Sequence, residues 1–241
     1  MMPLKIKPLE AAIHFISTHF PHCRAALLAG SVVRGEATAT SDLDIIIFDD
    51  TLVSSYRESF IESGWAIELF AHNLTSYRPF FEQDCRRAIP SLPRMVTEGI
   101  VLKDTNIVED IKREARTLLD NGPEAWSDET IEMKRYFLTD TLDDLIGYKT
   151  RAEGLFIAGT LATLVCEFIL RTNRQWTGSS KWSYRALERY DPLAAQELVA
   201  VLEEYYQMNE TDALIRYVDK TLSPFGGRLF AGFSLGKLNE T

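Results

Sequence analysis

Two short apolar runs, each bordered by small or acidic residues, constrain the fold of this chain most strongly. Residues 24–29 are largely apolar and end at Gly30, which is typical of a buried strand that stops at a turn. Residues 43–48 are rich in isoleucine, and Asp42 and Asp44 lie at the start of this run. Side chains two apart in a strand share a face, so the two carboxylates are expected side by side. The pattern predicts a buried sheet with paired acids at the start of one strand.

The neighbouring segments predict that the first part of the chain mixes helices and strands. Residues 9–20 have apolar side chains at helical spacing, and residues 65–71 are typical of a further strand. Residues 32–34 predict the first turn of a helix, with Ser31 near its cap. Residues 54–63 predict a short helix, stopped by the glycine that follows.

The pattern becomes helical from about residue 106 onward. Amphipathic or buried helices are predicted over residues 107–119, 128–150, 153–171, 192–207 and 212–222. The segment 224–227 predicts an irregular tail that packs on the body. We therefore expect an α+β protein with two domains, of which residues 1–105 form a small twisted sheet with helices and residues 106–241 are all helical.

The net charge of -9 restricts the partners of the chain. A protein that binds long nucleic acid usually neutralises the phosphates with a basic surface, and the sequence contains no basic stripe. Individual lysines and arginines can still hold a single nucleotide. The charge therefore argues against polymeric nucleic acid and leaves small nucleotides open.

Cysteine usage and the apolar segments favour a cytoplasmic protein. Cys23, Cys85 and Cys166 have no spacing, with one another or with histidines, that suits zinc. Residues 1–5 lack the apolar core of a signal peptide. The most apolar stretch, residues 155–170, contains an acid and is short for a membrane span, so it predicts a buried helix. We expect no membrane partner.

The residues around the two runs suit phosphate and metal chemistry. Gly30 and Ser31 lie between a strand and a predicted helix, where exposed N–H groups and the helix dipole favour phosphate. The carboxylates of Asp42 and Asp44 repel each other unless a cation lies between them. Hard oxygen ligands suit Mg²⁺, which also binds substrate phosphates. Such a pair can hold two ions, one for the attacking hydroxyl and one for the triphosphate.

Glu68 is the predicted third carboxylate of this site. It lies inside the apolar run 65–71, on the face that also carries Ala66 and Phe70. An unpaired carboxylate there would be costly, so a metal ion or a basic partner is implied. Two interpretations stay open, a catalytic acid or a structural ion pair with an arginine.

These motifs resemble the signature of the DNA polymerase beta-like nucleotidyltransferase superfamily. Within it, the nearest branch is that of the antibiotic nucleotidyltransferases, which act on aminoglycosides or lincosamides and add a helical domain. The residues that carry the resemblance are Gly30, Ser31, Arg34, Gly35, Ser41, Asp42 and Asp44. The resemblance implies that residues 1–105 are the catalytic domain, that Asp42 and Asp44 bind Mg²⁺, and that Glu68 is a metal ligand or base.

The resemblance also implies a nucleotide site shared by both parts of the chain. Residues 174–182 are similar to a segment of the streptomycin/spectinomycin adenylyltransferases, in which a lysine contacts the nucleotide phosphates; here that lysine is Lys181. A surface lysine without a ligand is the alternative. The implied nucleotide-binding residues are Gly30, Ser31, Arg34, Ser41 and Lys181.

The expected activity is transfer of a nucleoside monophosphate, AMP from ATP or from another nucleoside triphosphate, to a hydroxyl of a small molecule such as an aminoglycoside-like antibiotic. The helical part is expected to bind this acceptor. One alternative is an enzyme or antitoxin that adenylylates a protein, and the large helical part argues against it. Another is a nucleotide-binding module without turnover, and the intact acidic set argues against that. The sequence does not predict the acceptor or the oligomeric state.

Overall fold

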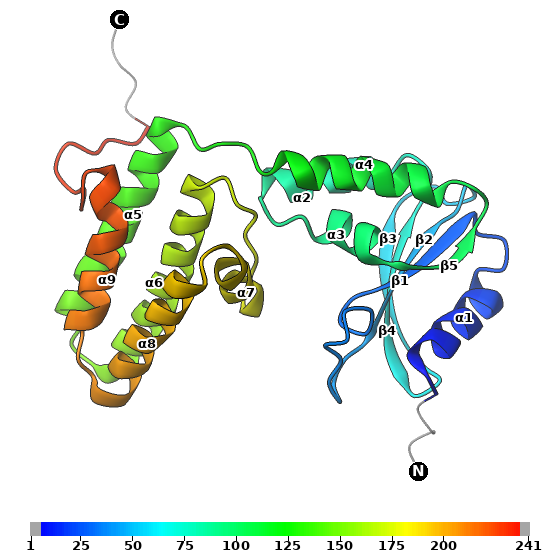
Figure 1. Cartoon of the computed structure of the whole chain (residues 1–241), viewed down its shortest axis with the longest axis horizontal. Helices are drawn as coiled ribbons and strands as arrows, with labels where there is room; N and C mark the ends of the chain where they lie inside the picture. The colour runs from blue at the N-terminus through cyan, green and yellow to red at the C-terminus, as the bar shows by residue number, and fades with distance from the viewer. Residues whose placement is uncertain (1–5, 237–241) are drawn as a thin grey trace, which may run out of the picture. The chain divides into compact units, whose positions relative to one another are not determined.

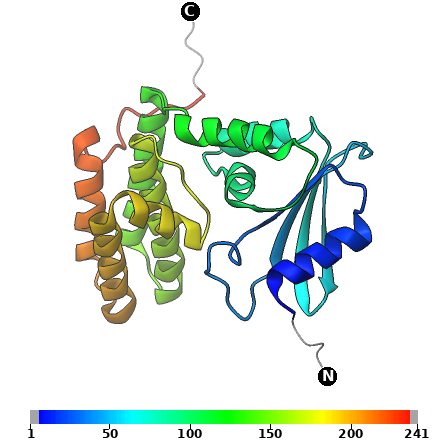
Figure 2. The same cartoon turned by 45° about the vertical axis from the view of Figure 1, so that its right-hand side comes forward.

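A computed structural model describes residues 6–236 of the chain, which divides into two compact units after Asn121 (Figures 1 and 2). The first unit contains the sheet, and the second is helical. The chain is thus an α+β protein, in agreement with the predicted class. The expectation that the chain lacks a signal-peptide core concerns residues 1–5, which lie outside the described residues.

The first unit is built on a five-stranded mixed sheet with the order β3-β4-β2-β1-β5. Its strands are β1 (Ala25–Ala29), β2 (Leu43–Phe48), β3 (Tyr56–Glu62), β4 (Trp65–His72) and β5 (Ile100–Asp104). β2 and β4 pair in parallel, and the other neighbouring strands are antiparallel. β1 and β2 are the apolar runs that the sequence predicts as buried strands, and both are almost entirely buried.

Helices cover both faces of the sheet (Figure 1). On one face, α1 (Pro8–His19) packs against a core that includes Leu43 and Ile45. The other face carries α2 (Tyr77–Arg86), α3 (Ser91–Glu98) and α4 (Val108–Asn121). Ile46 belongs to this second core, so Asp44, two residues earlier, lies on the same face of β2.

The position of α4 moves the division between the units from the predicted residue 105 to Asn121. Val108 and Ile111 of α4 are buried in the core that also contains Leu27 of β1. This apolar face needs the sheet to cover it, so α4 belongs to the first unit although its sequence resembles that of the later helices.

Residues 54–63 do not form the predicted helix. They contain the edge strand β3, which is joined to β4 by the two residues Ser63 and Gly64. Both have positive φ, 53° and 79°, which is the backbone conformation of a tight hairpin turn. The glycine that was expected to end a helix instead reverses a strand.

Residues 32–34 do not start a helix either. The backbone forms a single turn over residues 31–35, in which Val33 N–H donates to the Gly30 carbonyl at 3.2 Å. Gly35 then has a φ of 73°, which lies outside the helical region, and the turn does not continue.

Over residues 122–236, the described part of the second unit, the chain forms a bundle of five helices, close to the predicted pattern. They are α5 (Asp128–Gly147), α6 (Arg151–Thr172), α7 (Lys181–Tyr190), α8 (Pro192–Met208) and α9 (Asp212–Leu222), followed by the short turn Ser223–Phe225. The core contains Leu142, Leu161 and Phe168 together with Leu214. α7 is the helix of this unit that the sequence analysis does not predict.

α6 is long and apolar enough to cross a membrane by length and composition alone, with 22 residues and a hydropathy of 1.7. Core helices of globular units pass the same test. Leu161, Val165 and Phe168 of α6 are buried in the bundle core, whereas Phe156 is 82% exposed, so α6 is buried on one side and not throughout as predicted.

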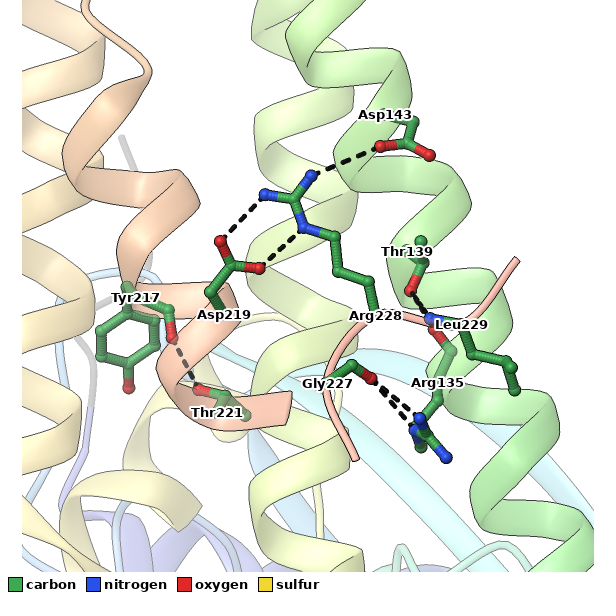
Figure 3. A network of polar contacts seen from close by, with 9 residues as sticks. All are labelled: Arg135, Thr139, Asp143, Tyr217, Asp219, Thr221, Gly227, Arg228 and Leu229. Atoms are coloured by element: carbon green, nitrogen blue, oxygen red, sulfur yellow. Dashed lines mark hydrogen bonds and ion pairs between the residues drawn. The ribbon is translucent and has the colours of Figure 1, made fainter. Parts of the chain in front are cut away.

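Residues 226–229, which we call the strap, join the first and last helices of the bundle (Figure 3). Arg228 donates hydrogen bonds to both carboxylate oxygens of Asp219 in α9, at 2.7 and 2.9 Å. The contacts of the strap with α5 are Arg135 with the Gly227 carbonyl, Thr139 with the Leu229 N–H, and Asp143 with Arg228. The strap, which follows α9 in the sequence, therefore ties α5 to α9.

Candidate metal centre

The sheet brings three carboxylates together on one face. Asp44 of β2 lies directly opposite Glu68 of β4 in the parallel register, and Asp42 precedes Asp44 by one strand repeat. One carboxylate oxygen from each of the three residues lies within 4.8 Å of the others, and all three side chains are half-buried. We call these residues the carboxylate triad. They are the three acids that the sequence predicts as metal ligands, and the strand register explains their meeting.

The electrostatics of the triad favour a bound cation. The pKa of Asp44 is raised from 3.8 to about 6, mainly by burial and also by the nearby negative charges of Asp42 and Glu68. The positive charges of Arg34 and Arg57 oppose this rise. A divalent ion between the carboxylates would relieve their repulsion, and an all-oxygen donor set suits Mg²⁺. The residues present therefore fit the implied metal.

Gly30 brings the backbone into close contact with the carboxylate triad. It has a φ of 80°, and a Cβ atom at this position would lie only 1.9 Å from Oδ2 of Asp44. A glycine is thus required twice, for the left-handed backbone and for the close approach to the carboxylate. The sequence predicts close approach to a ligand; the structure adds that Asp44 itself occupies the space beside Gly30.

The predicted nucleotide-binding hydroxyls lie in the loop between β1 and β2. Ser31 Oγ donates to Ser41 Oγ at 3.1 Å, and Ser41 Oγ also accepts from the Thr38 N–H at 2.8 Å. These bonds tie the two ends of the loop together. Whether the two serines contact phosphate stays a prediction.

Arg34 is tied to the other side of the same loop. Its guanidinium donates to Glu98, at the end of α3, at 3.0 Å and to Glu36 at 3.4 Å. The ion pairs anchor the loop to α3 and keep a positive charge near Asp44, which lowers the Asp44 pKa. Both structural and ligand-binding interpretations of Arg34 are compatible with these contacts.

Glu68 has a basic partner that the sequence analysis missed. Arg57, on the edge strand β3, forms an ion pair with Oε2 of Glu68, and its guanidinium lies 4.8 Å from the ring centre of Phe70. The structural ion pair that was left open for Glu68 is therefore present. It does not replace the acidic cluster, because Glu68 meets the ligand spacing with Asp42 and Asp44 as well.

Lys181 belongs to the helical unit, not to the unit that carries the triad. It is the first residue of α7, is exposed, and has its Nζ atom 5.9 Å from the ring centre of Trp182. The turn before it is tight, as predicted, since a Cβ atom on Gly178 would lie 2.4 Å from Cβ of Trp182. Its contact with a nucleotide stays a prediction.

A shallow pocket of about 220 Å³ lies beside the triad, and its lining includes Asp42, Ser59 and Glu68. A slightly larger pocket, of about 260 Å³, lies between α1 and β5; apolar residues line much of both pockets, but only the smaller one contains carboxylates. Because metal and phosphate chemistry needs charged ligands, we assign the candidate site to the smaller pocket.

Comparisons with known proteins add little to this geometry. No protein-family model matches the sequence, and a search of curated proteins finds no match. Among solved structures, the chain is similar to a nucleotidyltransferase-like protein from Exiguobacterium sibiricum 255-15, determined at 1.90 Å resolution. The similarity is distant. The identity is 12%, the TM-score is 0.49, and the match covers 90% of this chain and 75% of the other. At this level it carries no conclusion about activity.

Metal binding by the triad should depend on pH. Because the Asp44 pKa is raised to about 6, protons compete with a cation below that pH, and Mn²⁺ affinity should fall as the pH falls through this value. Calorimetric titration of the metal-free protein with Mn²⁺, well below and well above pH 6, measures the effect. In Asp44→Asn the dependence on pH in this range should disappear. An affinity that stays constant across this range in the wild type would contradict the assignment.

Proposed function

We propose that the protein is a metal-dependent nucleotidyltransferase, which moves a nucleoside monophosphate, AMP from ATP or from another nucleoside triphosphate, to a hydroxyl of a small molecule. The observation that carries the proposal is the carboxylate triad on one face of the sheet, beside the close approach of Gly30. Paired and neighbouring carboxylates with this spacing suit the metal-assisted displacement of pyrophosphate.

Each residue of the site has a role in this proposal. Asp42, Asp44 and Glu68 would hold Mg²⁺, as two ions if the site follows two-metal chemistry. When bound, the metal supplies positive charge that stabilises the phosphates and favours ionisation of the acceptor hydroxyl. Glu68 would either complete the metal site or accept the hydroxyl proton. Gly30 and Ser31 offer backbone N–H groups and a hydroxyl to the triphosphate, with Arg34 and Ser41 nearby in the same loop.

The helical unit is proposed to bind the acceptor and, through Lys181, a nucleotide phosphate. A lysine acts there as a point charge for phosphate. The net charge of -9 favours a cationic acceptor over an anionic one, which suits an aminoglycoside-like antibiotic. We propose a cytoplasmic location for this reaction, with no long nucleic acid and no membrane as partner.

A labelling experiment tests the proposal. ATP and GTP labelled in the α-phosphate are incubated with the protein, Mg²⁺ and, in separate reactions, aminoglycosides, lincosamides and cell extract. A labelled small molecule supports the proposal, and Asp44→Asn should not produce it. A labelled protein band in extract would instead indicate an enzyme that adenylylates proteins. Nucleotide binding without label in any acceptor would favour a binding module.

A further inference from the structure

The ion pair between Arg57 and Glu68 is built from two neighbouring strands. In the antiparallel register of β3 and β4, Arg57 lies opposite Phe70, and Ser59 lies opposite Glu68. Arg57, Phe70 and Glu68 therefore share one face of the sheet, with Arg57 diagonal to Glu68. The Phe70 ring supports the guanidinium at 4.8 Å, which directs it toward the triad.

This arrangement gives Glu68 two competing partners. A carboxylate oxygen of Glu68 lies close enough to Asp42 and Asp44 for the three to share a metal ion. Its Oε2 atom already accepts a hydrogen bond from Arg57. A divalent ion at the triad would withdraw negative charge from Glu68 and would also repel the guanidinium. Binding of the ion must therefore weaken the Arg57–Glu68 pair.

A released Arg57 would still be close to the site. Its side chain is 59% exposed, against 29% for Glu68, so it can turn without crossing the core. Its strand is at the edge of the sheet, next to the pocket lined by Ser59 and Glu68. A planar guanidinium with several donors matches the oxygens of a phosphate chain better than any other side chain.

We propose that Arg57 is a positioning residue that holds Glu68 in the metal-free protein and binds the phosphates of a nucleoside triphosphate once a metal ion occupies the triad. This inference rests on the proposed function. It makes the affinities for metal and nucleotide interdependent: the ion alone has to displace Arg57 from Glu68, whereas the ion with nucleotide gives Arg57 a new partner.

The test uses Arg57→Gln, which removes the charge and keeps a polar side chain of similar reach. Two affinities of the whole protein are measured, for Mn²⁺ alone and for a non-hydrolysable ATP analogue in the presence of Mn²⁺. The affinity for Mn²⁺ alone should rise about tenfold, because a repelling positive charge is lost. The affinity for the analogue should fall about tenfold, because a charge-assisted contact with phosphate is lost. Arg57→Lys, which keeps the charge, should retain the wild-type affinity for Mn²⁺.

Arg78→Gln is the matched control, because Arg78 forms a comparable exposed ion pair with Glu114 in the same unit. Neither affinity should change in this variant. If Arg57→Gln weakens both affinities together or leaves both unchanged, while the wild type binds metal and analogue, the inference is overturned and the proposed function stands. If the wild type binds neither Mn²⁺ nor the analogue, the proposed function fails, and this inference fails with it.

Discussion

Replacement of Asp44 by Asn should abolish turnover and, in the absence of metal, make the protein more stable. The change keeps the shape of the side chain and removes one negative charge from the carboxylate triad. Loss of a metal ligand removes several kcal/mol of transition-state stabilisation, so the turnover number should fall by about 10³-fold or more. Turnover is measured by the labelling assay with the acceptor that it identifies.

The gain in stability follows from the direction of the pKa shift. The folded protein holds the Asp44 proton more tightly than the unfolded chain, because the pKa is raised from 3.8 to about 6. The ionised carboxylate therefore lowers the free energy of unfolding above pH 6 and has no such effect below pH 3.8. The loss is about 1–3 kcal/mol, because solvent screens the partly exposed carboxylate. Asn removes this cost.

Thermal unfolding in EDTA and in Mn²⁺ measures both consequences. In EDTA at slightly alkaline pH, Asp44→Asn should unfold at a higher temperature than the wild type. In Mn²⁺ the wild type should gain stability by binding the ion, and the variant should gain less. Asp120→Asn, at an exposed position of α4, is the control and should alter neither activity nor stability. An Asp44→Asn variant that melts far below the wild type in EDTA but keeps its activity would show that the residue is structural.

Replacement of Gly30 by Ala should disable the same site through geometry. The new methyl group would lie 1.9 Å from Asp44 Oδ2, so either the carboxylate or the turn has to move. A displacement of about 1 Å at a reacting centre can cost about a hundredfold in rate, and we expect at least that loss together with weaker Mn²⁺ binding. The positive φ of 80° adds about 1 kcal/mol or more of backbone strain.

The variant Gly35→Ala separates the contact with Asp44 from the backbone strain of a positive φ. Gly35 has a similar φ of 73°, but among the described residues no atom lies within 4 Å of the added Cβ. Its stability cost should resemble that of Gly30→Ala, while Mn²⁺ binding is kept. Turnover and Mn²⁺ affinity are measured for both variants, together with urea unfolding. Equal losses of metal affinity in the two variants would mean that backbone strain in the loop, and not contact with Asp44, is responsible.

The carboxylate triad could be predicted because it depends on strand geometry. Asp42 and Asp44 are two residues apart at the start of a strand, and Glu68 lies in the next apolar run, so a pairing of the two strands brings all three together. The burial of Leu43 and Ile45 on the opposite face follows from the same alternation. Strand alternation was sufficient to place Asp42 and Asp44 side by side, and the family resemblance supplied the expected metal-binding role of the three acids.

Arg57 could not be predicted, because the sequence pattern favours a helix over residues 54–63. β3 is an edge strand with mostly exposed side chains on both faces, so it has no apolar alternation to mark it. The sequence signal for a hairpin was the Ser63-Gly64 dipeptide, which is typical of turns and whose residues both adopt positive φ in the structure. The same difficulty applies to α4: its apolar face identifies a helix, but only the three-dimensional packing shows that the sheet covers it.

The strap has a consequence for the order in which the chain can fold during its synthesis. Every element of the first unit precedes residue 122, so that unit can complete its core while the helices are still being translated. The bundle differs, because Arg228 and its neighbours link α5 to α9 only after all five helices have been made. Until the ribosome has added these residues, Arg135 and Thr139 of α5 lack the backbone partners that the strap gives them in the folded bundle.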